Sequence, residues 1–476
     1  MDRHPLIEEI TTPLTPPAVF DLFYSQPNSC FLDSGMDPQR LGRYSFIGID
    51  PFLIVRSFGT EIELSWKQSR RVEQGNPFNV LGRLLSLYSL DPAPSPVPFL
   101  GGAMGYLSYD LCHFIERLPT TAKDDLEFPE SYFAFYDAII AFDNLEHKTY
   151  IVSTGFPELQ DSERIKRAQL RLEEMKGKLF TPPAHIIATS PSPKENPQTV
   201  LRSNFTREDY IKAVQKARDY IIAGDIFQVN LSQRFETELT VKPYELYQRL
   251  RQINPAPFAA YLNFNDITVV SASPERFLCV NGDQVETRPI KGTRPRGKGL
   301  EQDAMFAQEL LNSIKDRAEN VMIVDLERND IGRVCQYGSV QVTELAILEI
   351  FPTVFHLTST VVGKLRPGIS RIDLLKATFP GGSITGAPKV RSMEIIDELE
   401  PTRRSVYTGA IGYLSFSEHL DLSIVIRTFL IKGNKAYFQL GGGIVYDSDP
   451  QAEYEETLHK GRALMEALKL APNMAV

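Results

Sequence analysis

The sequence predicts an α+β fold in which antiparallel β-sheets form a sandwich-like core with helices packed outside. Many short runs of β-branched and aromatic residues, such as those at 259–264 and 409–416, are typical of strands. Two longer segments, at about 301–324 and 450–470, have the apolar spacing of helices. Strands and helices do not alternate regularly, which disfavours a sheet built from βαβ units.

A segment rich in proline, serine and threonine divides the chain at 181–203. It has no apolar periodicity, which is typical of a linker. We therefore predict an N-terminal region at 1–180 and a second region at 204–470.

The second region opens with a helix and a strand. Thr206 and Asp209 have the spacing of a capping box. Apolar residues then recur at helical spacing, and Gly224 supplies a stop. Between Phe227 and Phe235 apolar residues alternate with polar ones. This alternation predicts a strand with one buried face and one polar face.

Composition and charge limit the classes of function. The chain has 476 residues, of which 42% are hydrophobic, and its net charge is −9. A nucleic-acid or membrane-surface role needs a positive field and is not expected. The N-terminus has no apolar signal segment, and no apolar run approaches the roughly 18 residues that span a bilayer. Four widely spaced cysteines form no CxxC pair, so we expect reduced thiols in a cytoplasmic protein.

Several familiar motifs are absent or incomplete. The glycine-rich segment 380–389 fails the phosphate-loop pattern because two residues separate Gly386 from Lys389. The triplet 441–443 lacks the third spaced glycine of a dinucleotide turn. The sequence contains no GxSxG elbow, no zinc-ligand spacing and no cysteine in a glutaminase-like context.

Two predicted helices each place acids on one face. Asp316 and Glu319 are three residues apart on the first, and Glu453, Glu456 and Lys460 share a face of the second. Carboxylates from two helices can form an oxygen site for Mg²⁺. The same spacing is common on solvated helix faces, so the pattern alone leaves both interpretations open.

Three further residues are candidates for catalysis. Lys291 lies in the basic segment 286–298, which is a solvated loop by default. Neighbouring cations and burial would instead lower the pKa of Lys291 and leave a neutral nucleophilic amine. Glu275 follows a strongly β run and could act as a general acid if its pKa is raised. His356 lies in an apolar stretch, where a lone histidine is more often a hydrogen-bonded core residue.

The order of the motifs resembles one enzyme family. Four motifs follow one another along the chain in this order: SPERF at 273–277, RPIKGTRPRG at 288–297, FPGGSITGAPK at 379–389 and GGGIVYDSDPQAEYEET at 441–457. This order is similar to that of the chorismate-utilising enzymes, which comprise anthranilate, aminodeoxychorismate, isochorismate and salicylate synthases. The resemblance covers most of 204–470 and implies an anthranilate synthase component I-like fold with a chorismate-binding catalytic region there.

The resemblance also implies a magnesium cofactor and a substrate site. Glu319 and Glu456 would bind Mg²⁺ directly, while Asp316 and Glu453 would act through its waters. Glu275 matches the acid that assists departure of the C4 hydroxyl of chorismate. The other matched positions would contact the substrate: His356, Thr385, Gly386, Tyr407, Arg427, Gly441, Gly442 and Lys460.

Two positions separate the reactions within the resembled family. Gln228 stands where isochorismate- and salicylate-forming members have a water-activating lysine, so water addition is disfavoured. Lys291 stands where anthranilate synthases, and some aminodeoxychorismate synthases, have alanine. The lysine form resembles aminodeoxychorismate synthases in which the lysine adds at C2 and ammonia then adds at C4. We therefore expect amination of chorismate to 4-amino-4-deoxychorismate, in 4-aminobenzoate and folate biosynthesis.

Two alternatives remain. An anthranilate synthase component I, of tryptophan biosynthesis, would share every metal and carboxylate position. A non-catalytic small-molecule sensor would have no need to keep the four acids, Glu275 and Lys460. Because no glutaminase nucleophile is found, we expect ammonia to come from a separate glutamine amidotransferase subunit. Tryptophan binding is left open, since 254–258 reads NPAPF rather than the NPSPYM of tryptophan-inhibited relatives.

Overall fold

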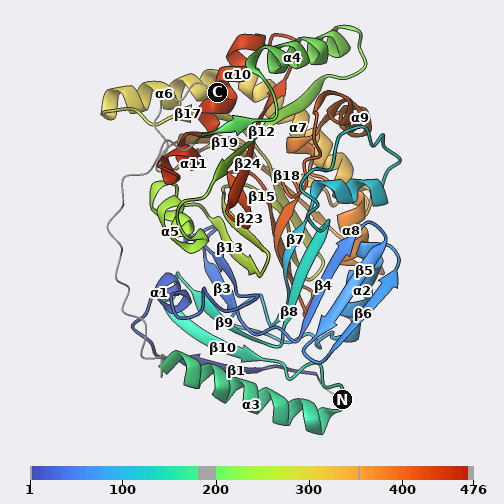
Figure 1. Cartoon of the computed structure of the whole chain (residues 1–476), viewed down its shortest axis with the longest axis vertical. Helices are drawn as coiled ribbons and strands as arrows, with labels where there is room; N and C mark the ends of the chain where they lie inside the picture. The colour runs from blue at the N-terminus through green and yellow to red at the C-terminus, as the bar shows by residue number, and fades with distance from the viewer. Residues whose placement is uncertain (1–2, 181–199, 352–353, 470–476) are drawn as a thin grey trace.

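The computed structural model describes residues 3–180, 200–351 and 354–469. Most of the predicted linker, 181–203, lies outside these ranges. In the described part of the chain, two large antiparallel sheets stack against each other and helices cover their outer surfaces (Figure 1). The predicted fold class is confirmed.

Each sheet contains twelve strands in the described residues. The first has the order β1 (Leu6–Ile10), β10 (Lys148–Ser153), β9 (Ala138–Asp143), β3 (Tyr44–Gly48), β2 (Cys30–Asp33), β13 (Phe258–Phe264), β14 (Ile267–Ser273), β23 (Thr428–Lys432), β24 (Lys435–Ile444), β12 (Gln228–Glu238) and β11 (Arg202–Ser203), with β20 (Gly386–Ala387) paired to β12. The second has the order β17 (Ile290–Pro295), β19 (Val354–Lys364), β16 (Gln284–Arg288), β15 (Arg276–Asn281), β22 (Leu420–Ile424), β21 (Ala410–Ser415), β7 (Gly102–Leu107), β8 (Ser131–Tyr136), β4 (Leu53–Phe58), β5 (Glu61–Trp66) and β6 (Ser69–Gln74), with β18 (Gln341–Ile350) paired to β19.

Both sheets combine strands from the two predicted regions. In the first sheet β2 pairs with β13, and in the second β7 pairs with β21. Residues on the two sides of the predicted linker therefore share one hydrogen-bonded framework. The division at 181–203 stays a prediction about the chain, and it does not separate two sheets.

The helices lie outside the sheets and complete the core. The α-helices are α1 (Pro16–Phe20), α2 (Pro77–Leu87), α3 (Asp161–Phe180), α4 (Arg207–Ile222), α5 (Pro243–Ile253), α6 (Leu300–Asn312), α7 (Ile314–Gly332), α8 (Arg371–Thr378), α9 (Lys389–Leu399), α10 (Pro450–Lys460) and α11 (Arg462–Ala467). Two 3₁₀ turns, η1 (Tyr109–Phe114) and η2 (Gly382–Ile384), accompany them.

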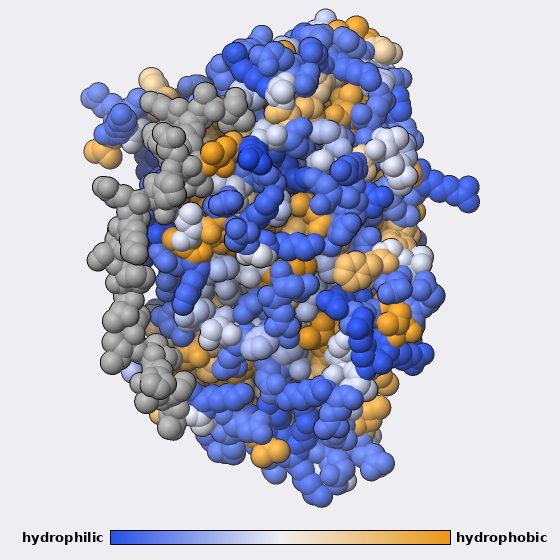
Figure 2. All heavy atoms as spheres, viewed as in Figure 1, coloured by the Kyte–Doolittle hydropathy of each residue, from blue (hydrophilic) through white to orange (hydrophobic). Residues whose placement is uncertain are grey.

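Aromatic side chains fill the space between the sheets. Phe46 of the first sheet packs edge-on against Tyr413 of the second, with ring centroids 5.2 Å apart. A second core lies between the first sheet and helices α1, α3, α5 and α11. Burial of these rings and of the aliphatic side chains around them helps to hold the two halves of the chain together. The face drawn in Figure 2 is largely hydrophilic, with apolar side chains in small scattered groups.

Both long helices predicted from the sequence are interrupted. Ser313 separates α6 from α7, because its hydroxyl accepts the N–H of Asp316 at 3.2 Å and so caps a new helix. Gly461 separates α10 from α11. The predicted helix after Thr206 is confirmed as α4, with the Thr206 hydroxyl accepting the Asp209 N–H at 3.1 Å.

The predicted strand after Phe227 is confirmed as β12, but its polar face is not open to solvent. Gln228, Asn230, Ser232 and Arg234 are all buried, and β20 and α9 pack against this strand. None of the helices in the described part of the chain combines the length and the apolar content needed to cross a bilayer.

Candidate active site

The predicted site residues come from both sheets and from two helices. Lys291 lies on β17, Glu319 on α7 and Glu456 on α10, and these elements meet near the ends of β12 and β24 in the upper part of Figure 1. Gly443 marks the meeting point. A Cβ there would lie 2.3 Å from Gln228 Nε2 and 3.7 Å from Lys291 Nζ. The side chains of Gln228 and Lys291 therefore both end close to the backbone of Gly443.

Lys291 is half-buried, and its amine is held by one hydrogen bond. Nζ donates to the Ser383 carbonyl at 2.8 Å. Burial lowers the pKa of Lys291, while the nearby carboxylates of Glu319 and Glu275 act in the opposite direction. The solvated-loop interpretation of this residue is therefore wrong.

The cations next to Lys291 in the sequence are not what lowers its pKa. They are engaged in ion pairs of their own, Arg288 with Glu349, Arg294 with Glu309 and Arg296 with Asp303. The cation that does contribute is Lys460, from α10. The prediction that burial would act on Lys291 is confirmed, and its explanation by neighbouring residues in the loop is corrected.

Glu275 lies just after β14 and is 4% exposed. Burial raises its pKa, opposed by a hydrogen bond from the Ser383 side chain and by the charge of Lys291. The backbone N–H of Ile290 donates to Oε1 at 3.3 Å. A buried carboxyl with a raised pKa has the property that a general acid needs at neutral pH.

His356 lies on β19 and is buried. Its Nδ1 is 2.8 Å from the Thr293 hydroxyl, and burial lowers its pKa to about 3. The ring is therefore neutral at pH 7. In the described residues Nε2 has no hydrogen-bond partner, which is unusual for a buried polar atom. The sequence-based view of His356 as a hydrogen-bonded residue in an apolar stretch holds for one nitrogen only.

The four predicted acids lie on α7 and α10, and each has a different partner. Asp316 accepts from Arg294 at 3.0 Å, and Glu453 accepts from the Ser448 hydroxyl at 2.6 Å. Glu456 pairs with Lys460 at 2.7 Å, and Glu319 lies 4.0 Å from Lys315. Among the described residues no three histidine, cysteine or acidic side chains converge closely enough to form a ready-made metal cluster.

The electrostatics of these acids nevertheless link the two helices. Burial raises the pKa of Glu319 and of Glu453, and the charge of Glu456 raises both further. Lys460 lowers the pKa of Glu456. A Cβ at Gly442 would lie 3.2 Å from Glu453 Oε2, 3.6 Å from Glu456 Oε1 and 3.7 Å from Lys460 Nζ. The two helix faces are therefore linked electrostatically, although Glu456 and Lys460 remain exposed to solvent, and metal binding stays a prediction.

The predicted substrate-contacting residues surround this region. Lys460 Nζ donates to the Gly441 carbonyl at 3.0 Å. Thr385 is fully buried, and its hydroxyl donates to the Gly381 carbonyl at 3.0 Å. Arg427 is half-buried with a φ of 51°, and burial lowers its pKa to about 10 against the opposing charge of Glu275.

Two of the predicted positions have specific structural roles. Gly386 has a φ of 148°, and a Cβ there would lie 2.2 Å from the Gln228 carbonyl. No side chain fits at this position, because β20 and β12 approach so closely. Gln228 is 1% exposed, and neither polar atom of its amide has a partner in the described residues.

Sequence reasoning missed an ion pair behind the site. Arg404 and Glu400 form a fully buried bidentate pair at 2.7 and 3.0 Å. Arg404 also donates to the Asn230 carbonyl at 2.6 Å and stacks on Tyr407 at 5.8 Å. The spacing of an acid and an arginine four residues apart was the available signal, but it does not distinguish a buried pair from a surface pair.

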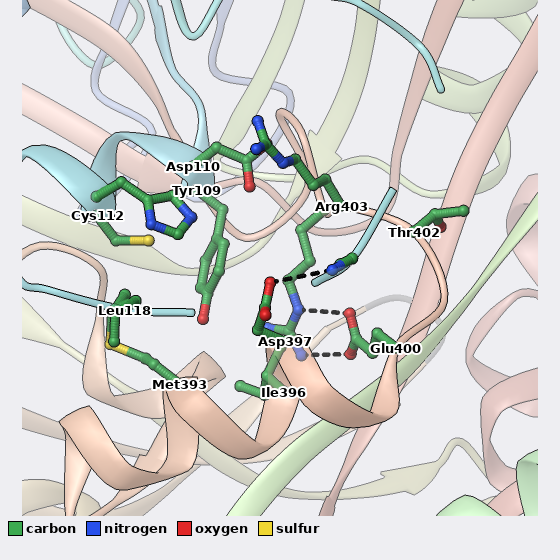
Figure 3. A pocket seen from close by; sticks show the side chains of 13 residues that line it. Tyr109, Asp110, Cys112, Leu118, Met393, Ile396, Asp397, Glu400, Thr402 and Arg403 are labelled. Atoms are coloured by element: carbon green, nitrogen blue, oxygen red, sulfur yellow. Dashed lines mark hydrogen bonds and ion pairs between the residues drawn. The ribbon is translucent and has the colours of Figure 1, made fainter. Parts of the chain in front are cut away.

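This ion pair also borders a small cavity. Figure 3 shows Tyr109, Asp110 and Cys112 on one side of it, with Met393 and Ile396 of α9 and Glu400, which directly follows α9, on the other. Lys291, Glu319 and Glu456 do not line it. The cavity is therefore separate from the residues that the sequence predicted.

Comparison with known families decides the wider assignment. The model of the chorismate binding enzyme family matches residues 28–466. The chain belongs to this family. It is therefore a chorismate-using enzyme, as the order of the motifs predicted.

The curated relatives of this family member carry two different names. The chain is 41% identical over 436 residues to aminodeoxychorismate synthase component 1 of Bacillus subtilis, which covers 92% of this chain and 91% of the relative. It is 39% identical over 461 residues to anthranilate synthase component 1 of Pseudomonas aeruginosa, covering 96% and 93%. Overall identity does not separate the two reactions.

A solved structure confirms the fold of this chorismate binding enzyme. Anthranilate synthase component I from Streptococcus pneumoniae superposes with a TM-score of 0.76 at 34% identity, covering 90% of this chain and 92% of that chain. The isochorismate synthase MenF of Escherichia coli has a TM-score of 0.71 at 16% identity. The second likeness concerns the fold alone.

Proposed function

We propose that the chain is the component that aminates chorismate to 4-amino-4-deoxychorismate. The observation that carries the proposal is the environment of Lys291. A primary amine whose pKa is lowered by burial lies against Gly443 and shares Ser383 with Glu275. A neutral amine beside a protonated carboxyl is the pair that nucleophilic addition with loss of a hydroxyl requires.

In the proposed reaction Lys291 Nζ forms a bond to C2 of chorismate. The two conjugated double bonds of the ring each shift by one position, the bond from C4 to its hydroxyl breaks, and Glu275 supplies the proton with which that hydroxyl leaves as water. Ammonia then forms a bond to C4, both double bonds shift back, the bond between C2 and Lys291 breaks, and one proton of the new C4 ammonium group returns to Glu275. The amine is released and the product carries nitrogen at C4.

Gln228 supports amination rather than hydration. Its amide is uncharged and cannot deprotonate a water molecule, as a lysine at this position would. Because both polar atoms of the buried amide lack protein partners, they are free to hydrogen-bond to a substrate or to ammonia. His356 is also buried and neutral, and its Nε2 has no hydrogen-bond partner in the described residues, so this nitrogen is available to a ligand as well.

We further propose that Mg²⁺ binds between α7 and α10. The donors present are hard carboxylate oxygens, which suit this ion, and the burial of Glu319, together with the nearby charge of Glu456, favours a cation there. Glu319 and Glu456 would hold the ion directly, and Asp316 and Glu453 through water. When bound, it would offset the charge of the ring carboxylate of chorismate.

The source of ammonia in this proposal is a separate glutamine amidotransferase subunit. A glutaminase nucleophile needs a reactive thiolate, and this chain offers none. Burial raises the pKa of Cys30 and Cys279 to about 12 and that of Cys335 to about 11, and it raises the pKa of Cys112 as well. An enzyme of 4-aminobenzoate and folate biosynthesis would work in the cytoplasm.

The second candidate is anthranilate synthase component I, since relatives of that name are almost as similar. A product assay separates the two. The protein is incubated with chorismate, Mg²⁺ and ammonium, and the products are resolved by chromatography. We expect a 4-amino product that yields 4-aminobenzoate only after a lyase is added. Anthranilate formed without any lyase would contradict the proposal.

A further inference from the structure

A buried carboxyl behind the site has no part in the proposed reaction. Glu327 lies on α7, two turns beyond Glu319, and is 2% exposed. Its Oε1 accepts the backbone N–H of Gly382 at 2.9 Å. Its Oε2 lies 3.4 Å from the hydroxyl of Thr287. Glu327 thus binds the first residue of the 3₁₀ turn η2.

The turn that Glu327 holds is the one that contacts both proposed catalytic groups. Ser383 follows Gly382 directly. The Ser383 carbonyl accepts a hydrogen bond from Lys291 Nζ at 2.8 Å, and the Ser383 side chain hydrogen-bonds to Glu275. A displacement of η2 would therefore move the hydrogen-bond partners of the nucleophile and of the acid together.

The turn fits tightly against α7. A Cβ at Gly382 would lie 2.6 Å from Leu326 Cδ2 and 3.1 Å from Glu327 Oε1. One helical turn further along α7, Asp330 pairs with Lys389, which also donates to the Pro380 carbonyl at 2.8 Å. Two acids on one face of α7 therefore fasten both ends of the segment 380–389.

Packing alone does not explain a carboxyl at position 327. An ionisable group in a buried position costs folding free energy that an amide or an aliphatic side chain would avoid. Burial and the neighbouring Asp330 raise the pKa of Glu327 to about 7. The cost suggests that the acceptor geometry at Gly382 is retained for a purpose other than stability.

We propose that Glu327 is a positioning residue. It fixes η2, so that the carbonyl of Ser383 holds Lys291 Nζ and the side chain of Ser383 holds Glu275 in a fixed arrangement relative to each other. The effect of Glu327 on the reaction rate rests on the proposed amination. The effect of Glu327 on the pKa of Lys291 does not rest on it, because the hydrogen bonds are present without substrate. The two ideas can therefore fail separately.

The first test measures Lys291 in the absence of chorismate. The full chain is treated with acetic anhydride across a range of pH, and acetylation of Lys291 is followed by peptide mass spectrometry, with the exposed Lys298 as internal reference. In Glu327→Leu the turn loses its acceptor and water reaches the amine. The pKa that governs acetylation of Lys291 should rise toward its ordinary value, and the rate near neutral pH should fall by about 3- to 10-fold.

Two matched variants separate positioning from general loosening. Glu327→Gln keeps an oxygen acceptor for Gly382 and should stay within about twofold of the wild type. Val324→Ala removes buried methyl groups from the same helix without touching these hydrogen bonds, and it should lower the melting temperature while leaving the acetylation profile unchanged. If Glu327→Leu does not fold, Glu327→Asp withdraws the carboxylate by one methylene and gives the same comparison.

The second test is kinetic. Glu327→Leu should lower kcat by about 10-fold with little change in KM for chorismate, and Glu327→Gln should restore most of it. A folded Glu327→Leu with wild-type acetylation and wild-type kcat would overturn the inference, as would an equal shift in Val324→Ala. A shifted Lys291 profile in a protein that makes only anthranilate would reject the proposed reaction and keep the role of Glu327.

Discussion

The two sides of the candidate site differ in how far they are assembled. The lysine side, comprising Lys291, Glu275 and His356, is held by hydrogen bonds to the backbone and to neighbouring hydroxyls. The acidic side, comprising Asp316, Glu319, Glu453 and Glu456, is distributed over α7 and α10, and its acids are paired with side chains other than a metal.

This difference follows from charge. On the lysine side burial favours the neutral forms of all three groups, so they pack together without mutual repulsion. On the acidic side several carboxylates repel one another, and Lys315 and Lys460 offset part of that repulsion. The protein thus builds the neutral half of the site by itself, whereas the charged half depends on cations.

The strongest way to break this comparison is to remove the amine. Lys291→Met keeps the length and apolar stem of the side chain but removes the nucleophile. We expect formation of the 4-amino product to fall by a factor on the order of 10³, measured by chromatography with saturating ammonium. Lys298→Met, an exposed cation of the same basic segment, is the matched control and should behave as the wild type. Undiminished turnover in Lys291→Met would exclude the covalent route.

The second prediction concerns the protons on the lysine side. The reaction needs Lys291 neutral and Glu275 protonated. Activity should therefore rise with pH as Lys291 deprotonates around its lowered pKa, and fall as Glu275 loses its proton above its raised pKa. Glu275→Gln should lower kcat by about 100-fold and abolish the alkaline limb of the pH profile. An alkaline limb that persists in the variant would assign it to another group.

The third prediction tests the proposed Mg²⁺ site on the acidic side, by removing a cation that competes with the metal. Lys315 lies 4.0 Å from Glu319 and is about half-exposed. Because exposed ion pairs are weak, Lys315→Met should tighten Mg²⁺ binding only about 2- to 5-fold, as measured by titration calorimetry. Arg328→Met removes a cation of the same helix that pairs with Asp325, and it should leave the affinity unchanged. Weaker Mg²⁺ binding in Lys315→Met would contradict a metal site between these helices.

The smallest effect concerns stability. The pKa of His356 is about 3 in the folded protein and 6.5 for the free side chain. The unfolded chain therefore binds a proton between these values that the folded chain does not, so stability is lost as pH falls from 6.5 toward 3. Each pH unit in this window costs up to about 1.4 kcal/mol through this group. Denaturant titrations of His356→Gln should show a shallower loss. Equal slopes in the two proteins would mean that His356 is charged or solvated.

The residues of the lysine side were predicted partly from local sequence patterns and partly from the resemblance to a family. Strand periodicity placed Glu275 and the strand of Gln228 correctly, because alternation is a local property. The surroundings of Lys291 include Ser383, Gly443 and the charge of Lys460, which all lie far away in the chain, and local spacing suggested a solvated loop. Resemblance to a family brought these distant segments together where periodicity did not.

What the sequence could not predict is equally specific. Ser313 was read as part of one long helix, because its capping bond depends on a break that propensity does not show. Glu327 gave no signal, and the spacing of Glu400 and Arg404 did not reveal a buried pair, because the roles of Glu327 and Arg404 arise from backbone N–H and carbonyl groups that only the fold brings near. The sequence placed Lys460 on the same helix face as Glu456, but it did not indicate that Asp316 would pair with Arg294 or that Glu453 would accept from Ser448.

The most direct measurement of the central claim looks for the bond itself. The protein is mixed with chorismate and Mg²⁺ without ammonia, quenched in acid, digested and analysed by mass spectrometry. We predict that the peptide containing Lys291 gains the mass of chorismate less one water, and that added ammonium removes this adduct as 4-amino product appears. An unmodified Lys291 in a preparation that turns over chorismate would contradict the account.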